Sequence, residues 1–183
     1  MRENSASQYL VVRRVHSGDL DTICDHFLRL DVGVRRSRFF GAVSDTGVLK
    51  YARNIIRYDT IACGAFVGGQ LRGLVELSGL FHSWPSTAEA AFSVESGWQN
   101  IGIGDALFEQ MFAMAQNRGV RTIRMICLKE NSHMRYLAAK HNAQLIFGSD
   151  AVEAVLYPSW PTPGSIVKEM IAETREYSHL LFG

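Results

Sequence analysis

The pattern of apolar and polar positions divides the first half of the chain into a strand, two helices and a block of strands. Residues 9–15 predict a strand, and apolar positions at helical spacing predict a helix that Ser17 caps and that extends to Leu28. A second helix is expected over residues 45–57, whereas the basic run 35–40 has no regular period. Further strands are expected at residues 60–67, 71–80 and 88–94, the first two joined by a glycine hairpin turn at residues 68–69.

In the second half of the chain, helices separate the expected strands. A long helix is expected from Gly102 to a stop at Gly119, and a shorter one begins at a cap on Asn131 or Ser132. The other strands are predicted at residues 120–128, 144–147 and 152–157. Strands paired first by hairpins and later separated by helices imply an α/β (α+β) fold, with a mixed sheet and helices on both faces.

The pattern changes once more after the last expected strand. Residues 9–157 form the predicted domain, and residues 158–183 form a tail in which a proline-rich linker at 160–164 precedes an amphipathic helix over 166–179. This helix packs either on its own domain or against a second subunit, which would make the protein a homodimer.

Composition and charge exclude several classes of protein. A formal charge of +1 in 183 residues gives no argument for binding to nucleic acid or to a membrane surface, both of which favour a strongly basic face. The three cysteines have no zinc-ligand spacing and the six histidines form no ligand motif, so no metal is expected. Neither a signal peptide nor a membrane-spanning run is recognisable, and the cysteines are expected to be buried, reduced thiols in a cytoplasmic protein.

The segment most informative about chemistry is residues 94–104, between the strand 88–94 and the long helix. A strand-to-helix turn leaves backbone N–H groups unpaired at the positive end of the helix dipole. Glycines at 102 and 104 let this backbone approach a ligand closely, which favours a pyrophosphate site. A Rossmann or P-loop site is disfavoured, because there is no third glycine in register and no GK[ST] ending.

The run Gln-Asn-Ile-Gly-Ile-Gly at 99–104 resembles the Q/R-x-x-G-x-G/A signature of the GNAT superfamily of acetyltransferases. The order of elements over about residues 9–157 is similar too. The resemblance implies a mostly antiparallel mixed sheet that splays apart between its fourth and fifth strands. It also implies direct transfer of an acetyl group from the cosubstrate acetyl-CoA to an amine.

The resemblance also implies which residues hold acetyl-CoA. The backbone of Phe92, Ser93 and Val94 would contact the pantetheine arm, with the Val94 N–H as an oxyanion donor to the thioester carbonyl. Asn131 matches a position that contacts the cofactor. The pyrophosphate would be held by the signature residues Gln99, Asn100, Ile101, Gly102, Ile103 and Gly104.

Two positions depart from the family pattern. Ile101 stands where Arg or Lys is frequent, so phosphate recognition must rely on backbone amides and on cations such as Arg135 or Lys140. Ala138 stands where many members have a tyrosine that protonates the leaving thiolate. Tyr136 lies on another side of the predicted helix, so the usual general acid is missing.

Glu89 is the first candidate for the general base that deprotonates the acceptor amine, since it lies on the strand entering the site in an apolar run that would desolvate it. Glu76 is the second candidate. His82 and Trp84 are expected to line the acceptor pocket. Residues 88–91 and 37–40 resemble runs in the protein-lysine acetyltransferase branch.

The residues leave the acceptor open: a protein lysine, a polyamine, an amino acid and an antibiotic amine all fit. In the direct transfer that the resemblance implies, the amine itself attacks and no nucleophile of the protein is needed, so neither Ser96 nor Cys127 is expected to form an acyl-enzyme. The alternative function is a GNAT-fold sensor that binds acyl-CoA with little or no turnover, which the alanine at 138 favours and Glu89 opposes.

Overall fold

The computed structural model describes residues 10–81 and 86–181, and within them the chain forms one seven-stranded sheet in the order β1-β2-β3-β4-β5-β7-β6. Every neighbouring pair is antiparallel except β4 and β5, which are parallel. The expected mixed, mostly antiparallel sheet is confirmed. The strands are β1 (Leu10–Arg14), β2 (Thr60–Val67), β3 (Gln70–Ser78), β4 (Thr87–Val94), β5 (Thr122–Leu128), β6 (Gln144–Phe147) and β7 (Ala151–Leu156).

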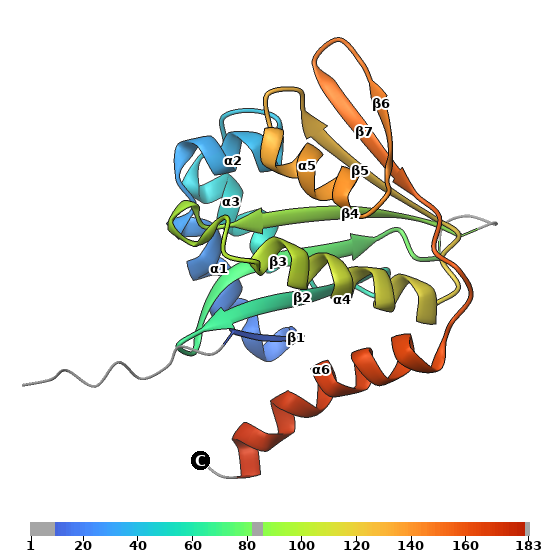
Figure 1. The fold of residues 1–183 in the computed structure, drawn as a ribbon. Helices are drawn as coiled ribbons and strands as arrows, with labels where there is room; N and C mark the ends of the chain where they lie inside the picture. Colours follow the sequence, from blue (N-terminus) through green and yellow to red (C-terminus); the bar gives the residue numbers. More distant parts are fainter. Residues whose placement is uncertain (1–9, 82–85, 182–183) are drawn as a thin grey trace, which may run out of the picture.

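Helices cover both faces of the sheet, as expected (Figure 1). The first three pack on one face over a core that includes Phe27, Leu71 and Leu74. The long helix α4 packs on the other face over a second core that includes Val75 and Leu77, and α5 contributes to this second core. The helices are α1 (Leu20–Arg29), α2 (Val32–Phe39), α3 (Asp45–Arg53), α4 (Ile103–Asn117), α5 (Ser132–Lys140) and α6 (Pro163–Leu181).

Strand β4 presents different residues to the two faces because successive side chains point in opposite directions. Ala88 and Ala90 belong to the α4 core. Glu89 and Ser93 therefore face the side of α1–α3, and the register places Glu89 opposite Ser78 and Ser93 opposite Leu74 on β3. The side that carries the polar residues of β4 is thus the side of the N-terminal helices.

Strands β4 and β5 separate soon after they begin. They pair only where residues 87–89 lie beside residues 122–124, and both strands continue beyond this ladder without pairing to each other. The expected splay between the fourth and fifth strands is confirmed. The peptide groups of the second half of β4 that face β5 are therefore released from the sheet.

The N-terminal helices differ from the sequence expectations in three details. Ser17 does not cap α1: it opens a 3₁₀ turn (Ser17–Asp19), whose Asp19 carboxylate instead accepts a hydrogen bond from the His16 N–H at 3.0 Å. Helix α3 ends at Arg53 rather than at residue 57. Helix α2 occupies a run for which no element was predicted; none of its residues is buried, so it lacks the apolar periodicity that predicts a helix.

Helix α6 begins at Pro163, three residues before the expected start, and packs on α4 and β1 of its own chain (Figure 1). Asn117 Nδ2 donates to the Ser165 carbonyl oxygen at 3.0 Å and to Glu169 Oε2 at 2.6 Å. Cys24, Cys63 and Cys127 are buried and free, as expected. No helix in the described part of the chain is both long and apolar enough to cross a membrane.

Candidate active site

A cavity of about 1050 Å³ opens where β4 and β5 separate. Glu89 lines it, together with every residue expected to bind acetyl-CoA except Ile101 and Ile103. The Ile101 side chain is exposed, and that of Ile103 is buried in the α4 core. The sequence-predicted residues in the cavity wall are Glu89, Phe92, Ser93, Val94, Gln99, Asn100, Gly102, Gly104 and Asn131.

The peptide groups of Val94 face the gap between the two strands. The next residue, Glu95, donates its N–H to the Arg72 carbonyl oxygen at 3.0 Å on the β3 side. Because successive peptide groups of a strand point to opposite edges, the Val94 N–H and C=O point away from β3. The Val94 carbonyl oxygen accepts a hydrogen bond there from Gln99 Nε2 at 3.1 Å. The Val94 N–H is therefore directed at the cavity, where it can donate to a ligand oxygen.

The loop before α4 presents further backbone donors to the cavity. Asn100 and Gly102 both have positive φ, 61° and 91°, and Gly102 occupies the N-cap of α4 without a side-chain cap. The first N–H groups of the helix are thus left for an anion at the positive end of its dipole. A Cβ on Gly102 would meet no atom within 4 Å, whereas one on Gly104 would lie 3.3 Å from Leu137 Cδ2. Gly104 therefore also lets α5 pack against α4.

Of the two cations proposed to supplement these amides, only Lys140 lies in the cavity wall; Arg135 does not line it. Lys140 Nζ lies 2.8 Å from Asp105 Oδ1 in the first turn of α4, and His141 Nε2 lies 3.1 Å from the same oxygen. The Lys140 hydrogen bond and charge lower the pKa of Asp105. A ligand phosphate here would compete with Asp105 for Lys140.

The start of α5 forms the opposite wall of the cavity. Asn131 caps this helix, since its Oδ1 accepts the Met134 N–H at 3.1 Å. Ala138 is buried in the core shared with α4, so no hydroxyl replaces the missing tyrosine there. Tyr136 is exposed and also lines the cavity.

Glu89 lines the cavity, but its side chain is exposed, so the expectation that its apolar neighbours desolvate it is wrong. The physical reason is the strand alternation: the neighbouring alanines, Ala88 and Ala90, fill the core on the opposite face. Glu89 is therefore a carboxylate in contact with water at the edge of the cavity. Solvent can exchange protons with it directly.

The second candidate base, Glu76, is buried, and both of its carboxylate oxygens accept hydrogen bonds. Arg38 Nη2 donates to its Oε1 at 2.6 Å, and the Tyr51 hydroxyl donates to its Oε2 at 2.6 Å. Burial and the negative charge of Glu76 raise the pKa of Tyr51. Burial alone would lower the pKa of Arg38, but the Glu76 carboxylate outweighs it and the pKa rises. Glu76 thus ties α2 and α3 to β3, and each of its carboxylate oxygens already accepts a hydrogen bond.

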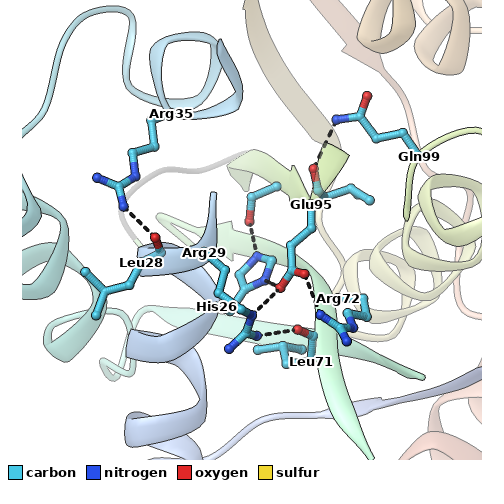
Figure 2. A network of polar contacts seen from close by, with 10 residues as sticks. His26, Leu28, Arg29, Arg35, Leu71, Arg72, Glu95 and Gln99 are labelled. Carbon is cyan, nitrogen blue, oxygen red and sulfur yellow. Dashed lines mark hydrogen bonds and ion pairs between the residues drawn. The ribbon is translucent and has the colours of Figure 1, made fainter. Parts of the chain in front are cut away.

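A buried polar network that sequence reasoning missed lies under the end of β4 (Figure 2). Ser93 Oγ lies 2.9 Å from His26 Nε2, and His26 Nδ1 lies 3.3 Å from Glu95 Oε1. Arg29 Nε donates to Glu95 Oε1 at 2.9 Å, and Arg72 Nη1 donates to Glu95 Oε2 at 2.8 Å. The one sequence feature that could have indicated this network is His26, a histidine beside the apolar positions of α1.

The burial of Glu95 opposes its ionisation, but hydrogen bonds from His26, Arg72 and Arg29 outweigh this cost and lower its pKa to about 2. Glu95 is therefore a carboxylate at neutral pH. Ser93 belongs both to this network and to the cavity wall, so the network reaches the site.

Helix α2 forms part of the cavity wall and reaches both sides of the splay. Asp31, its N-cap, accepts a hydrogen bond from the Ser96 hydroxyl beyond β4, and Arg36 Nη2 lies 3.3 Å from Glu130 Oε1 beyond β5. The expected acceptor-pocket residues His82 and Trp84 lie outside the described residues. No cluster of three or more metal-binding side chains occurs in the described part.

Comparison with solved structures gives many matches of the same fold. The GNAT domain of S. lividans PAT is 21% identical with a TM-score of 0.69, over 80% of this chain and 89% of that one. The Vibrio cholerae spermidine N-acetyltransferase, solved with CoA and spermine, is 17% identical with a TM-score of 0.62, over 81% of this chain and 95% of that one. The Escherichia coli ribosomal-protein-S18-alanine N-acetyltransferase is 14% identical with a TM-score of 0.65, over 85% of this chain and 97% of that one.

A search of curated proteins gave no match. Residues 34–142, more than half of the chain, match the model of the acetyltransferase (GNAT) family. This stretch contains the splayed strands, the glycine loop and α5, the elements that form the cavity. The chain therefore belongs to the GNAT acetyltransferase family.

Proposed function

We propose that this protein is an N-acetyltransferase that transfers an acetyl group directly from acetyl-CoA to an amine. The observation that carries the proposal is the released peptide group of Val94, whose N–H points into the cavity between β4 and β5. The glycine loop opens on the same cavity. A thioester carbonyl at Val94 and a pyrophosphate at the start of α4 would each meet backbone donors.

The residues fit acetyl-CoA in three respects. The cavity has room for the pantetheine arm, with a volume of about 1050 Å³. The positive φ of Gly102 turns the chain so that the first N–H groups of α4 remain open to a phosphate. Lys140 adds a cation in the wall. Ile101, exposed and uncharged, contributes no side-chain contact to a phosphate.

Glu89 is the proposed base. An alkylammonium has a pKa of roughly 10.4 and must lose a proton before it can attack the thioester. Glu89, exposed in the cavity wall, accepts this proton and releases it to water. The neutral amine then attacks the thioester carbon, and the Val94 N–H stabilises the negative charge that develops on the carbonyl oxygen.

Neither Cys127 nor Ser96, the two nucleophile candidates considered from the sequence, favours an acyl-enzyme route. Burial raises the pKa of the Cys127 thiol, which disfavours the reactive thiolate. The Ser96 hydroxyl donates to Asp31 and has no histidine among its hydrogen-bond partners. These observations oppose an acyl-enzyme on Cys127 or on Ser96.

The proposed acceptor is an amine on a protein lysine or on a small molecule. The similar solved structures include a spermidine N-acetyltransferase and an acetyltransferase of a ribosomal protein's alanine. The exposed carboxylate of Glu89 suits a cationic acceptor on electrostatic grounds. Glu130 lines the cavity as well.

A sensor that binds acyl-CoA with little turnover is the second candidate. The buried Ala138 favours it, because the family's usual acid for the leaving thiolate is missing. The deciding experiment is a turnover assay with acetyl-CoA against a panel of polyamines, amino acids, aminoglycosides and lysine peptides, with release of free CoA and acetylated product both measured. Acetylation of an amine supports the enzyme. Binding of acetyl-CoA with no acetylated product would refute it in favour of the sensor.

A further inference from the structure

The network under β4 has the composition of a proton relay. The hydrogen positions are assigned from ionised Glu95, which also accepts hydrogen bonds from Arg29 and Arg72. Glu95 is ionised and can only accept, so His26 Nδ1 must carry a hydrogen and donate it to Glu95 Oε1. In a neutral imidazole the other nitrogen is then an acceptor, and the Ser93 hydroxyl donates to His26 Nε2 at 2.9 Å. Ser93 Oγ keeps its lone pairs, and Ser93 lines the cavity.

Burying these polar side chains costs desolvation free energy. His26 is fully buried, and Ser93 is 3% exposed. An apolar pair of similar size would fill the space under β4 without the desolvation cost of a carboxylate, an imidazole and a hydroxyl. The network does touch the cavity through Ser93. A role in proton transfer gives these side chains a function beyond packing.

Resting on the proposed function, we propose that Ser93, with His26 behind it, carries the proton from the attacking nitrogen to the departing sulfur. After attack, the nitrogen bears a proton that the amide product cannot keep, and the sulfur leaves as a thiolate that needs one. Ser93 Oγ takes the nitrogen proton while its own hydroxyl proton passes to His26 Nε2. The steps then reverse: His26 returns a proton to Ser93, and Ser93 gives one to the sulfur.

This sequence balances without any other acid. The C–S bond breaks, the C–N bond forms, and the proton lost by nitrogen is the one gained by sulfur, so the relay ends as it began. Glu89 removes a different, earlier proton, the one that makes the acceptor an ammonium. The relay therefore supplies the group that is missing at Ala138, from the opposite side of the cavity.

The charges around His26 suit a transient carrier. Glu95 faces it from beyond β4 and stabilises a passing imidazolium. Arg29 on α1 and Arg72 on β3 both bind Glu95 and oppose the imidazolium. Phe27, on the same helix, packs its ring 5.6 Å from the imidazole. The carboxylate beside His26 is therefore shared with two guanidinium groups.

The test compares Ser93→Ala with Ser86→Ala in the full chain. Ser86 is also a buried serine, just before β4, and its hydroxyl donates to the Leu80 carbonyl oxygen at 3.3 Å, away from the cavity wall. Each change removes one buried hydroxyl, so both variants should lose a similar, small amount of stability. Acetyl-CoA affinity should stay within about twofold of wild type for both, because backbone groups hold the cosubstrate.

At pH 7 we expect kcat to fall about 100-fold in Ser93→Ala and to stay near wild type in Ser86→Ala. The pH profile separates a relay from a structural role. Without the relay, hydroxide must take the nitrogen proton, so kcat of Ser93→Ala should rise about tenfold per pH unit from pH 7 towards 10. A structural defect would lower kcat by the same factor at every pH. His26→Gln keeps a hydrogen-bonding side chain that cannot take up a proton. This variant should show the same pH profile as Ser93→Ala, and it provides the test if Ser93→Ala does not fold.

The outcomes are distinguishable. Wild-type turnover with the same kcat and pH profile in Ser93→Ala and Ser86→Ala would overturn the relay and leave the proposed function intact. An acetyl group trapped on Ser93 in the intact-mass spectrum would also overturn it, by making Ser93 a nucleophile. If wild type binds acetyl-CoA and acetylates no amine in the panel, the proposed function and the relay fall together.

Discussion

The stability of this fold should depend on pH through Glu95. Its pKa of about 2 lies below the ordinary value of 4.5, so ionised Glu95 stabilises the folded state. A depressed carboxyl pKa contributes stability that is present above the unfolded-state value and is lost as the pH falls towards the folded-state value. The window is therefore between about pH 5 and pH 2.

The size of this contribution to the unfolding free energy follows from the lowering of the Glu95 pKa. A displacement of this size corresponds to about 3 kcal/mol of unfolding free energy at neutral pH. Solvent screening reduces it, because the Arg29 side chain that faces Glu95 is 30% exposed. We therefore expect a titratable contribution of about 2 kcal/mol.

The perturbation is Glu95→Gln, which keeps the size of the side chain and removes its charge. Urea unfolding of wild type and variant at a series of pH values gives the difference in unfolding free energy. This difference should be largest at pH 6–7 and should narrow by about 1.5 kcal/mol by pH 2.5, since protonated Glu95 resembles glutamine and folded-state Glu95 is only partly protonated at that pH. Glu109→Gln is the control, because Glu109 pairs with Lys168 on the surface, and should change stability little at any pH.

The other carboxyl groups with lowered pKa, Asp19, Asp31 and Asp105, titrate in both proteins and cancel in the difference. A difference that stays constant from pH 7 to pH 2.5 would refute the assignment of the acid-sensitive contribution to Glu95. A wild type and variant of equal stability at pH 7 would refute the network's role in stability altogether.

Three further predictions concern the cavity. Acetyl-CoA at a hundredfold excess over its Kd should raise the unfolding free energy by about 2.7 kcal/mol, and a melting curve unmoved by millimolar acetyl-CoA would contradict both candidate functions. Gly102→Ala should weaken acetyl-CoA binding at least tenfold by calorimetry, whereas Gly69→Ala, at a similar positive φ in the β2–β3 turn and with equal free space, should cost similar stability and leave binding unchanged. Glu89→Gln should lower kcat about 100- to 10,000-fold and flatten the acid limb of the pH–rate profile while acetyl-CoA affinity stays; near-wild-type kcat across the pH range would exclude Glu89 as the base.

The periodicity of the sequence determined most of the elements. The strands at 60–67 and 144–147 were predicted with their observed bounds, and the cap at Asn131 was one of two predicted residues. These features depend on neighbours in the chain: side-chain alternation, turn glycines and a cap three residues from its N–H. The glycine loop was local in the same sense, so its place before α4 could be predicted.

What the sequence could not determine depends on which segments meet in space. Helix α2 buries none of its residues and so carries no apolar stripe, although tertiary contacts at Asp31 and Arg36 hold it beside the cavity. Glu89 is exposed because the core lies on the other face of β4. The residues next to Glu89 in the sequence do not specify which face the core covers. The apolar neighbours of Glu89 suggested that it is buried, but side chains alternate along a strand, so burial of these neighbours places Glu89 on the opposite face.

The two buried networks show the same limit most clearly. His26 and Ser93 are 67 residues apart, and Arg38 and Glu76 are 38 apart, so nothing in either local sequence indicates its partner. Their hydrogen bonds form because α1 and α2 pack on the face of the sheet where Ser93 and Glu76 point. The sequence alone therefore determined the family, most of the elements and the place of the glycine loop, which are local patterns. Only the tertiary structure decided which carboxylate is free for water and which is committed to an arginine, since burial and ionic pairing depend on the packing of distant segments.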